Sequence, residues 1–181
     1  MSYCQFVKNA NETKRVIHET YHDREYGFPI YDDNLLFERL VLEINQAGLS
    51  WETILKKKEG FQLAYYNFSV SKVANFSDED IQELLTNSGI IRNKLKVHAA
   101  IFNANSILAL SEEHGSFYNW LKLNHPLTLD QWVKLFKKHF KFVGNEIVNE
   151  FLMSIGILKG AHDEDCPVYK EILLEEPLWS L

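Results

Sequence analysis

The fold is decided by one stretch near the N-terminus, residues 32–51, which reads DDNLLFERLVLEINQAGLSW. Its apolar residues recur every three or four positions, as one face of an α-helix requires. Asp32 and Asp33 are suited to cap the start of a helix over about 34–47, and Gly48 is suited to end it. The stretch therefore predicts an amphipathic helix whose two ends are both marked.

The same helical spacing recurs along the rest of the chain, and no segment shows convincing strand alternation. Further helices are expected over Trp51 to about Lys57, after the capping box Ser77–Asp80, after Gly89 along Leu95, Ala99, Phe102, Ser106 and Leu110, after Ser116, around Trp132, and from Glu146 to Ile155. The connections are short, without repeats or a Pro/Gly-rich linker. The sequence therefore predicts an all-α protein in which residues 1–181 form a single unit, with two lobes possible.

Composition narrows the class of protein. Of the 181 residues, 46% are hydrophobic and 24% charged, as in folded globular proteins. We see no signal peptide and no apolar run long enough to cross a membrane, so we expect a cytoplasmic protein with reduced thiols. The net charge of −6 argues against nucleic-acid binding through bulk electrostatics. Any contact with DNA needs a local basic face, for which several lysine clusters are candidates.

Two residues near the C-terminus have the spacing of metal ligands. His162 and Cys166 are separated by three residues, which is common in zinc sites. Cys4 and His22 would complete a Cys₂His₂ set from the other end of the chain. Four protein ligands leave no position for water, so such a zinc would be structural. Spacing alone leaves an alternative open, namely two unrelated thiols and two surface histidines.

One carboxylate falls on the apolar face of the helix expected over 34–47. Glu43 is in line with Leu36, Leu40 and Ala47 at helical spacing. A buried carboxylate needs a partner, or its pKa rises. Glu43 is therefore either a structural group, satisfied by a lysine or by backbone amides, or an acid that faces a pocket.

Aromatic residues are dense around the same segments of the sequence. The rings close to the acid or to the candidate metal ligands are Phe6, Tyr21, Tyr26 and Trp51. Rings with one acid suit a flat, cationic, nitrogen-rich ligand, although core packing is the alternative.

A candidate anion site follows the helix around Trp132. That helix is basic and amphipathic, and a tight turn over Phe140–Gly144 leads into the next helix. Glycine allows close backbone approach, and the following helix presents free N–H groups to an anion. The pattern indicates a helix–hairpin–helix that grips a DNA phosphate, or else an ordinary helical hairpin.

Six segments together carry a family resemblance. They are Tyr21–Gly27, Leu42–Glu43 with Gln46–Trp51, Ile54–Lys58, Gly89–Arg92, Phe140–Gly144 and the His162-x₃-Cys166 ending. Over about Cys4 to Tyr169 the chain resembles the DNA-3-methyladenine glycosylase I family. It departs from the family at two positions. The usual motif has Trp where this chain has Tyr26, and the family often has Trp where this chain has Phe6.

The resemblance implies a helix–hairpin–helix DNA glycosylase fold whose N- and C-terminal ends are joined by one structural Zn²⁺. The implied zinc ligands are Cys4, His22, His162 and Cys166. The implied catalytic, base-contacting acid is Glu43, and the implied pocket rings are Phe6, Tyr21, Tyr26 and Trp51. The implied contacts to the DNA backbone are Lys141, Val143 and Gly144.

The implied activity is hydrolysis of the N-glycosidic bond of 3-methyladenine in double-stranded alkylated DNA. The damaged nucleotide would be flipped into the aromatic pocket, and no lyase step would follow. We expect a monomer, with no membrane or protein partner. Two other classes remain open, namely a zinc-stabilised DNA-binding module without catalysis and a zinc hydrolase that uses Asp163 or Glu164 as its base.

Overall fold

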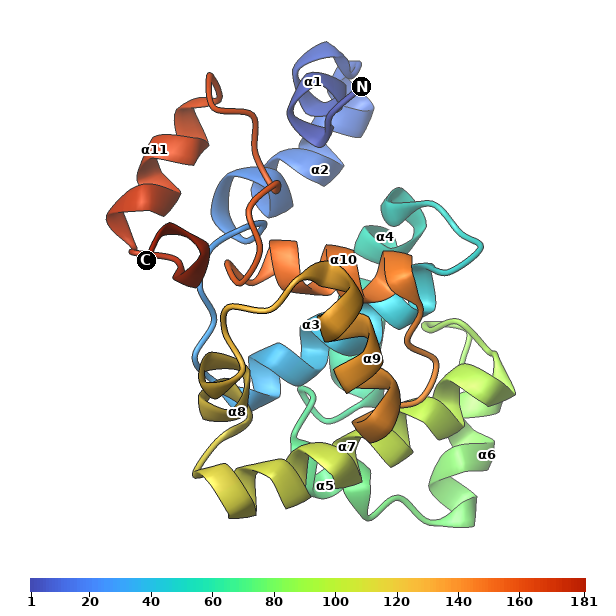
Figure 1. Cartoon of the computed structure of the whole chain (residues 1–181). Coiled ribbons are helices and arrows are strands. Elements are labelled where there is room, and N and C mark those ends of the chain that lie inside the picture. Colours follow the sequence, from blue (N-terminus) through green and yellow to red (C-terminus); the bar gives the residue numbers. More distant parts are fainter.

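The computed structural model describes residues 1–181 and contains helices and no strand, which confirms the predicted all-α class (Figure 1). The helices are α1 (Tyr3–Asn9), α2 (Glu12–Arg24), α3 (Asp33–Gln46), α4 (Trp51–Ala64), α5 (Val70–Ala74), α6 (Asp78–Thr86), α7 (Lys94–His114), α8 (Phe117–Leu123), α9 (Leu129–His139), α10 (Asn145–Ser154) and α11 (Pro167–Leu174), followed by a 3₁₀ turn η1 (Leu178–Ser180).

Helix α3 forms the centre of the molecule. Two of its predicted caps are confirmed, because the Asp32 carboxylate accepts hydrogen bonds from the amides of Asn34 and Leu35, and Gly48 adopts a φ of +81°. Asp33 instead accepts hydrogen bonds from the first amides of α8. Residues 36–45 are all buried, and α4, α7, α8 and α10 pack around them. A helix surrounded in this way holds polar side chains inside the protein, which is how Glu43 becomes buried.

Other expectations need correction. Helix α4 runs past Lys57 to Ala64, and α1, α2, α5 and α11 were not predicted. On α7, two residues of the predicted apolar stripe are exposed, Leu95 by 70% and Phe102 by 45%. Ala99 and Leu110 of the stripe are buried, but the rest of the buried face lies one position further along, at Lys96, Ala100, Asn103 and Ile107, with Val97 and Ala104 beside them. Apolar periodicity alone therefore misplaced this face.

The N-terminal and C-terminal segments of the chain adjoin each other. Helices α1 and α2 meet α11 and the loop before it, while α3 to α10 form the rest of the molecule (Figure 1). The main hydrophobic core belongs to the second group, and a separate small cluster around Cys4, Cys166, Val168 and Ile172 belongs to the ends. No helix combines the length and the apolar character that a membrane crossing requires.

Candidate functional site

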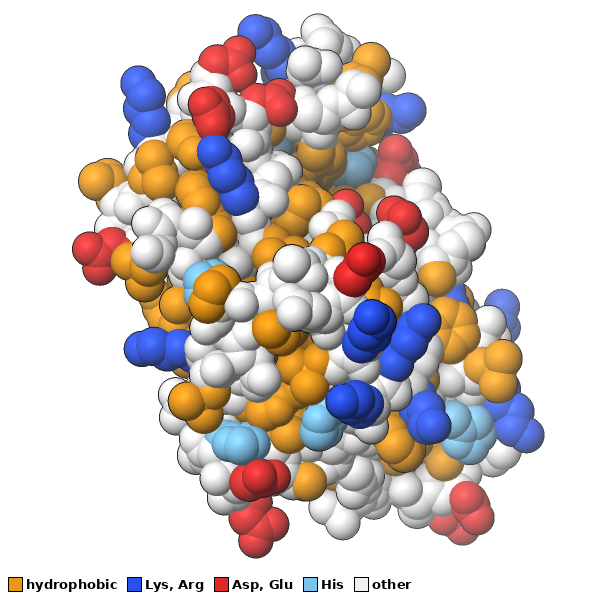
Figure 2. Space-filling model, in the orientation of Figure 1, with side chains coloured by type: hydrophobic (Ala, Val, Ile, Leu, Met, Phe, Trp, Pro, Cys, Tyr) orange, Lys and Arg blue, Asp and Glu red, His pale blue; other side chains and the backbone are white.

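A cavity of about 330 Å³ lies where the N-terminal helices face α3, α4 and α10, and we call it the inner cavity. Its wall includes Tyr3, Tyr21, Tyr26, Glu43, Trp51 and Glu150. In Figure 2 a hollow bordered by hydrophobic and acidic side chains separates the N-terminal helices from the rest. A second, more open cavity of about 570 Å³, the outer cavity, adjoins it and shares Glu43 and Glu150.

Glu43 points from α3 into the inner cavity. The residue is only 4% exposed, and no protein group forms a hydrogen bond or an ion pair with its carboxylate. Burial raises the pKa of Glu43 to about 8; the positive charge of Arg39 opposes this shift, and the negative charge of Glu150 adds to it. Arg39 is itself engaged, since its guanidinium donates to Tyr21 Oη at 3.1 Å and to the Ser154 carbonyl at 3.3 Å. Both carboxylate oxygens of Glu43 thus remain available to a ligand.

Three of the four predicted rings line the inner cavity. The ring centroids of Tyr21 and Trp51 are 4.9 Å apart, and those of Tyr21 and Tyr26 are 5.6 Å apart. The indole N–H of Trp51 is buried without a hydrogen-bond partner. Flat faces and an unpaired donor beside a carboxylate suit a planar heterocycle.

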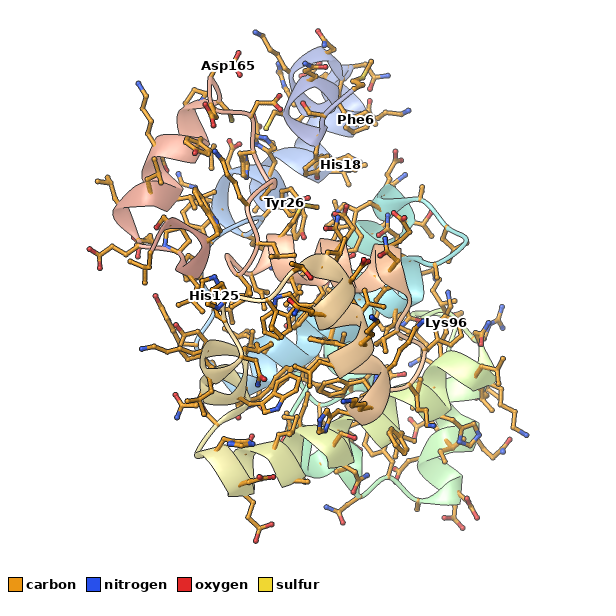
Figure 3. All side chains as sticks on the ribbon, in the orientation of Figure 1. Phe6, His18, Tyr26, Lys96, His125 and Asp165 are labelled. Carbon is orange, nitrogen blue, oxygen red and sulfur yellow. The ribbon has the colours of Figure 1, made fainter.

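Phe6 is the exception, because it does not line the cavity. Its ring packs against Tyr3, with centroids 6.2 Å apart, and edge-on against His18 at 5.0 Å (Figure 3). Tyr3, which the sequence analysis did not select, occupies the wall instead and meets the Tyr26 ring at 5.4 Å. Phe6 therefore supports the wall from behind, since α1 turns Tyr3 toward the cavity.

The four predicted metal ligands come together. The donor atoms of Cys4, His22, His162 and Cys166 all lie within 4.8 Å of one another. His162 Nδ1 is 3.4 Å from the Cys4 sulfur and 3.6 Å from the Cys166 sulfur. Tetrahedral zinc separates a nitrogen and a sulfur ligand by about 3.6 Å. The cluster can therefore hold a metal ion, and it connects the two ends of the chain.

Groups around the cluster orient its ligands. His162 Nε2 donates to the Tyr26 carbonyl at 2.8 Å, which leaves Nδ1 as the unprotonated nitrogen facing the thiols. His22 Nδ1 lies 2.6 Å from Asp23 Oδ1, so its Nε2 faces the cluster. The backbone N–H of Asp163 donates to the Cys4 sulfur at 3.4 Å. Each of these contacts is of the kind that fixes ligands around a bound metal.

Helices α9 and α10 pack together and are joined by the turn over 140–144. The buried amide of Asn103 fixes this turn, accepting from the Lys141 N–H at 2.8 Å and donating to the Lys141 carbonyl at 3.1 Å. Lys141 is exposed, the Val143 side chain is buried, and Gly144 caps α10 beside the outer cavity. Figure 2 shows Lys and Arg side chains gathered over α9 and this turn, so a local basic face exists despite the net charge.

Other residues of the site were missed by the sequence analysis. Leu49 is 41% exposed in the turn between α3 and α4, on the rim of the outer cavity. The ammonium of Lys96 anchors this turn, donating to the carbonyls of Asn45 at 2.9 Å and Ala47 at 2.7 Å. A large apolar residue between Gly48 and Ser50, where turns are usually polar, was the available signal for Leu49.

Comparisons with known proteins agree with this geometry. The family model described as methyladenine glycosylase matches residues 11–131. The chain is 36% identical over 170 residues to a DNA-3-methyladenine glycosylase of Haemophilus influenzae, covering 83% of this chain and 91% of that protein. It is 34% identical over 168 residues to DNA-3-methyladenine glycosylase 1 of Escherichia coli, covering 82% and 89%.

Solved structures show the same likeness. A crystal structure of a 3-methyladenine DNA glycosylase I variant in complex with 3-methyladenine superposes with a TM-score of 0.80 at 34% identity, covering 93% of this chain and 97% of that one. The Staphylococcus aureus 3-methyladenine DNA glycosylase I, studied for its recognition of 3-methyladenine, gives a TM-score of 0.75 at 34% identity, covering 84% and 90%.

Proposed function

The chain belongs to the methyladenine glycosylase family and is therefore a DNA glycosylase, a hydrolase of N-glycosyl bonds, and we propose that it releases 3-methyladenine from alkylated DNA. The observation that carries this proposal is Glu43, a buried acid without a protein partner, facing a cavity walled by aromatic rings. The target base is stacked inside duplex DNA and must first leave the stack, at a cost of a few kcal/mol. The inner cavity then receives it.

Recognition of the base follows from its charge. Methylation at N3 makes the base cationic while it is still attached to the sugar. The faces of Tyr21, Tyr26 and Trp51 attract a cation, each desolvated contact contributing on the order of 1–2 kcal/mol. Glu43 accepts hydrogen bonds from the donor edge of adenine and favours its positive charge. Guanine would present an acceptor oxygen to this carboxylate, so the pocket selects adenine over guanine.

The chemistry needs little acid catalysis, because the cationic base is already a good leaving group. The C1′–N9 bond breaks, its electron pair passes to the base, and the base leaves neutral. Water adds to C1′ and loses a proton to solvent. The wall of the inner cavity contains no lysine that could form a Schiff base with the sugar, which supports a monofunctional reaction without a lyase step.

DNA approaches from the side of the outer cavity. There the backbone at Val143 and Gly144, with the N-terminus of α10, offers N–H groups to a phosphate, and Lys141 adds a positive charge. Leu49 on the same rim is placed to fill the gap that the extruded base leaves in the stack. The partner is therefore double-stranded alkylated DNA.

The metal of the terminal cluster is zinc in this proposal, and its role is structural. Cys4, His22, His162 and Cys166 would fill all four positions and leave none for water, which disfavours a zinc hydrolase. Bound zinc would supply cross-linking between the two ends of the chain. The Tyr26 carbonyl beside His162 then connects the cluster to the cavity wall. A single unit over residues 1–181 and a monomeric protein are part of the same proposal.

The direct test is to incubate the purified protein with methylated duplex DNA and to identify the released bases by chromatography. We expect 3-methyladenine in large excess over any other base, with the sugar–phosphate backbone left unbroken. The same DNA without methylation is the matched control. Strand breaks without free base, or tight DNA binding with no base release, would contradict the proposal.

A further inference from the structure

The inner cavity holds a second carboxylate that the mechanism above does not use. Glu150 lies half-buried on α10 and lines both the inner and the outer cavity, as Glu43 does from α3. Two acids thus stand at the passage between the cavities. The sugar of a flipped nucleotide must lie at this passage, because its base enters the inner cavity while its phosphates stay on the DNA-facing side.

The two acids have no cationic partner of their own. Tyr26 Oη donates to Glu150 Oε2 at 3.0 Å, and this is the one hydrogen bond of the Glu150 side chain within the protein. Neither glutamate takes part in an ion pair. Arg39, the cation nearest to Glu43, is held by other acceptors. The passage therefore favours a positively charged ligand.

We propose that Glu150 is a second substrate-facing carboxylate of this active site, which stabilises the positive charge of the alkylated nucleotide as that charge passes from the base to the sugar. The inference rests on the proposed function. When the C1′–N9 bond breaks, its electron pair neutralises the base, and the sugar carries the positive charge until water adds. A group that favoured only the cationic base would stabilise the starting state more than the transition state. A carboxylate at the passage remains close to the charge throughout.

The two carboxylates also influence each other's ionisation. Burial raises the pKa of Glu43, Arg39 opposes the shift, and the charge of Glu150 adds to it. The titratable groups that face the pair are Arg39, Tyr21 and Tyr26 around Glu43, and Tyr26 and Glu146 around Glu150. Removing the charge of Glu150 lowers the pKa of Glu43, so base release, which needs ionised Glu43, extends to lower pH.

The test compares single-turnover release of 3-methyladenine by the wild-type protein and by Glu150→Gln, across the pH range around neutrality. Glutamine keeps the shape and an acceptor oxygen for Tyr26 but removes the charge. We expect the plateau rate at high pH to fall about 10-fold. We also expect the midpoint of the rising limb to move to lower pH by about half a unit. Rates are expressed per folded protein, so the midpoint of the pH profile remains informative even where the variant is less stable.

Two further variants separate charge from shape. Glu150→Asp keeps the charge and should recover most of the plateau rate and the wild-type midpoint. Glu112→Gln removes one charge from the exposed side of α7, away from both cavities, and should leave the midpoint unchanged.

Wild-type rates and midpoint in Glu150→Gln would overturn the proposal, and so would a Glu150→Asp variant as slow as Glu150→Gln. An inactive wild-type protein would overturn the proposed function and this inference together.

Discussion

The metal cluster and the inner cavity lie on two sides of one residue, Tyr26, and they differ in whether their polar groups are paired within the protein. In the cluster, the Tyr26 carbonyl accepts from His162, and the remaining donors all face one another. In the cavity, the Tyr26 hydroxyl donates to Glu150, but Glu43 is left without any partner. In the cluster, a bound metal would leave no polar group unpaired. In the cavity, Glu43 gains a partner only when a ligand binds.

This difference separates stability from function. The metal-binding side chains of the cluster hold the two terminal segments together, so the cluster should determine whether the protein folds. An unpaired buried acid costs folding free energy, and it is retained where binding uses it. Substitutions in the two regions should therefore have opposite effects on stability, which the following variants examine.

Loss of the cluster is expected to have the largest effect. Cys166→Ser removes one of four ligands, so the metal content should fall and the free energy of unfolding should drop by about 4 kcal/mol. For a chain of this size that lowers the melting temperature by roughly 8–16 °C. Melting curves and metal analysis of the purified variant measure both quantities.

Activity at low temperature then decides what the metal does. If the cluster is structural, Cys166→Ser should release 3-methyladenine nearly normally under conditions where it is still folded. A folded variant without activity would show that the metal takes part in the reaction. An unchanged melting temperature and metal content would show that these residues do not bind a stabilising metal.

Loss of the acid in the cavity should affect activity instead. Glu43→Gln keeps the shape of the side chain but removes its charge-assisted hydrogen bonds to the base, so we expect kcat/KM for 3-methyladenine release to fall roughly 100-fold. The measurement is base release from methylated DNA by a variant whose helical content matches the wild type. Full activity would exclude Glu43 as a base contact.

The same variant should be more stable than the wild type at neutral pH. The folded protein keeps a proton on Glu43 up to about pH 8, which the unfolded chain releases near pH 4.5, so wild-type stability declines between these values and is level above them. Glu43→Gln lacks this decline and should gain about 3 kcal/mol at pH 7, and nothing below pH 4.5. Urea unfolding at both pH values measures the gain, and equal stabilities at pH 7 would mean that Glu43 is ionised and paired.

Local patterns in the sequence were enough for α3 and for Glu43. The caps at Asp32 and Gly48 and the apolar repeat all act within a few residues, so the helix and its buried acid could be predicted together. The pair His162 and Cys166 is equally local. Cys4 and His22 lie far away in the sequence, so spacing could only offer them as candidates, and the family resemblance was needed to favour them.

The parts that were missed depend on how helices face one another. In the sequence, Glu150 and its polar neighbour Asn149 suggest a solvent-exposed side of α10. In the structure, the N-terminal helices cover this side, so Glu150 becomes part of a cavity wall. Tyr3 and Phe6 lie three residues apart on α1, and the rotation of that helix decides which ring enters the wall. No pattern within a single helix contains this information.

The smallest effect is expected at Glu38, which lies on the same helix as Glu43 and is also buried. Its carboxylate accepts from Gln62 at 3.2 Å and lies 3.7 Å from the Lys58 ammonium, so the protein already satisfies it. Glu38→Gln should therefore change base release by less than about 2-fold, because the inner cavity does not include this residue. Base-release rates of the two glutamine variants, measured side by side, provide the comparison. A large loss of activity in Glu38→Gln would show that removing any buried charge from α3 disturbs the site, and the contrast between a satisfied acid and an unpaired one would no longer identify the residue that binds the base.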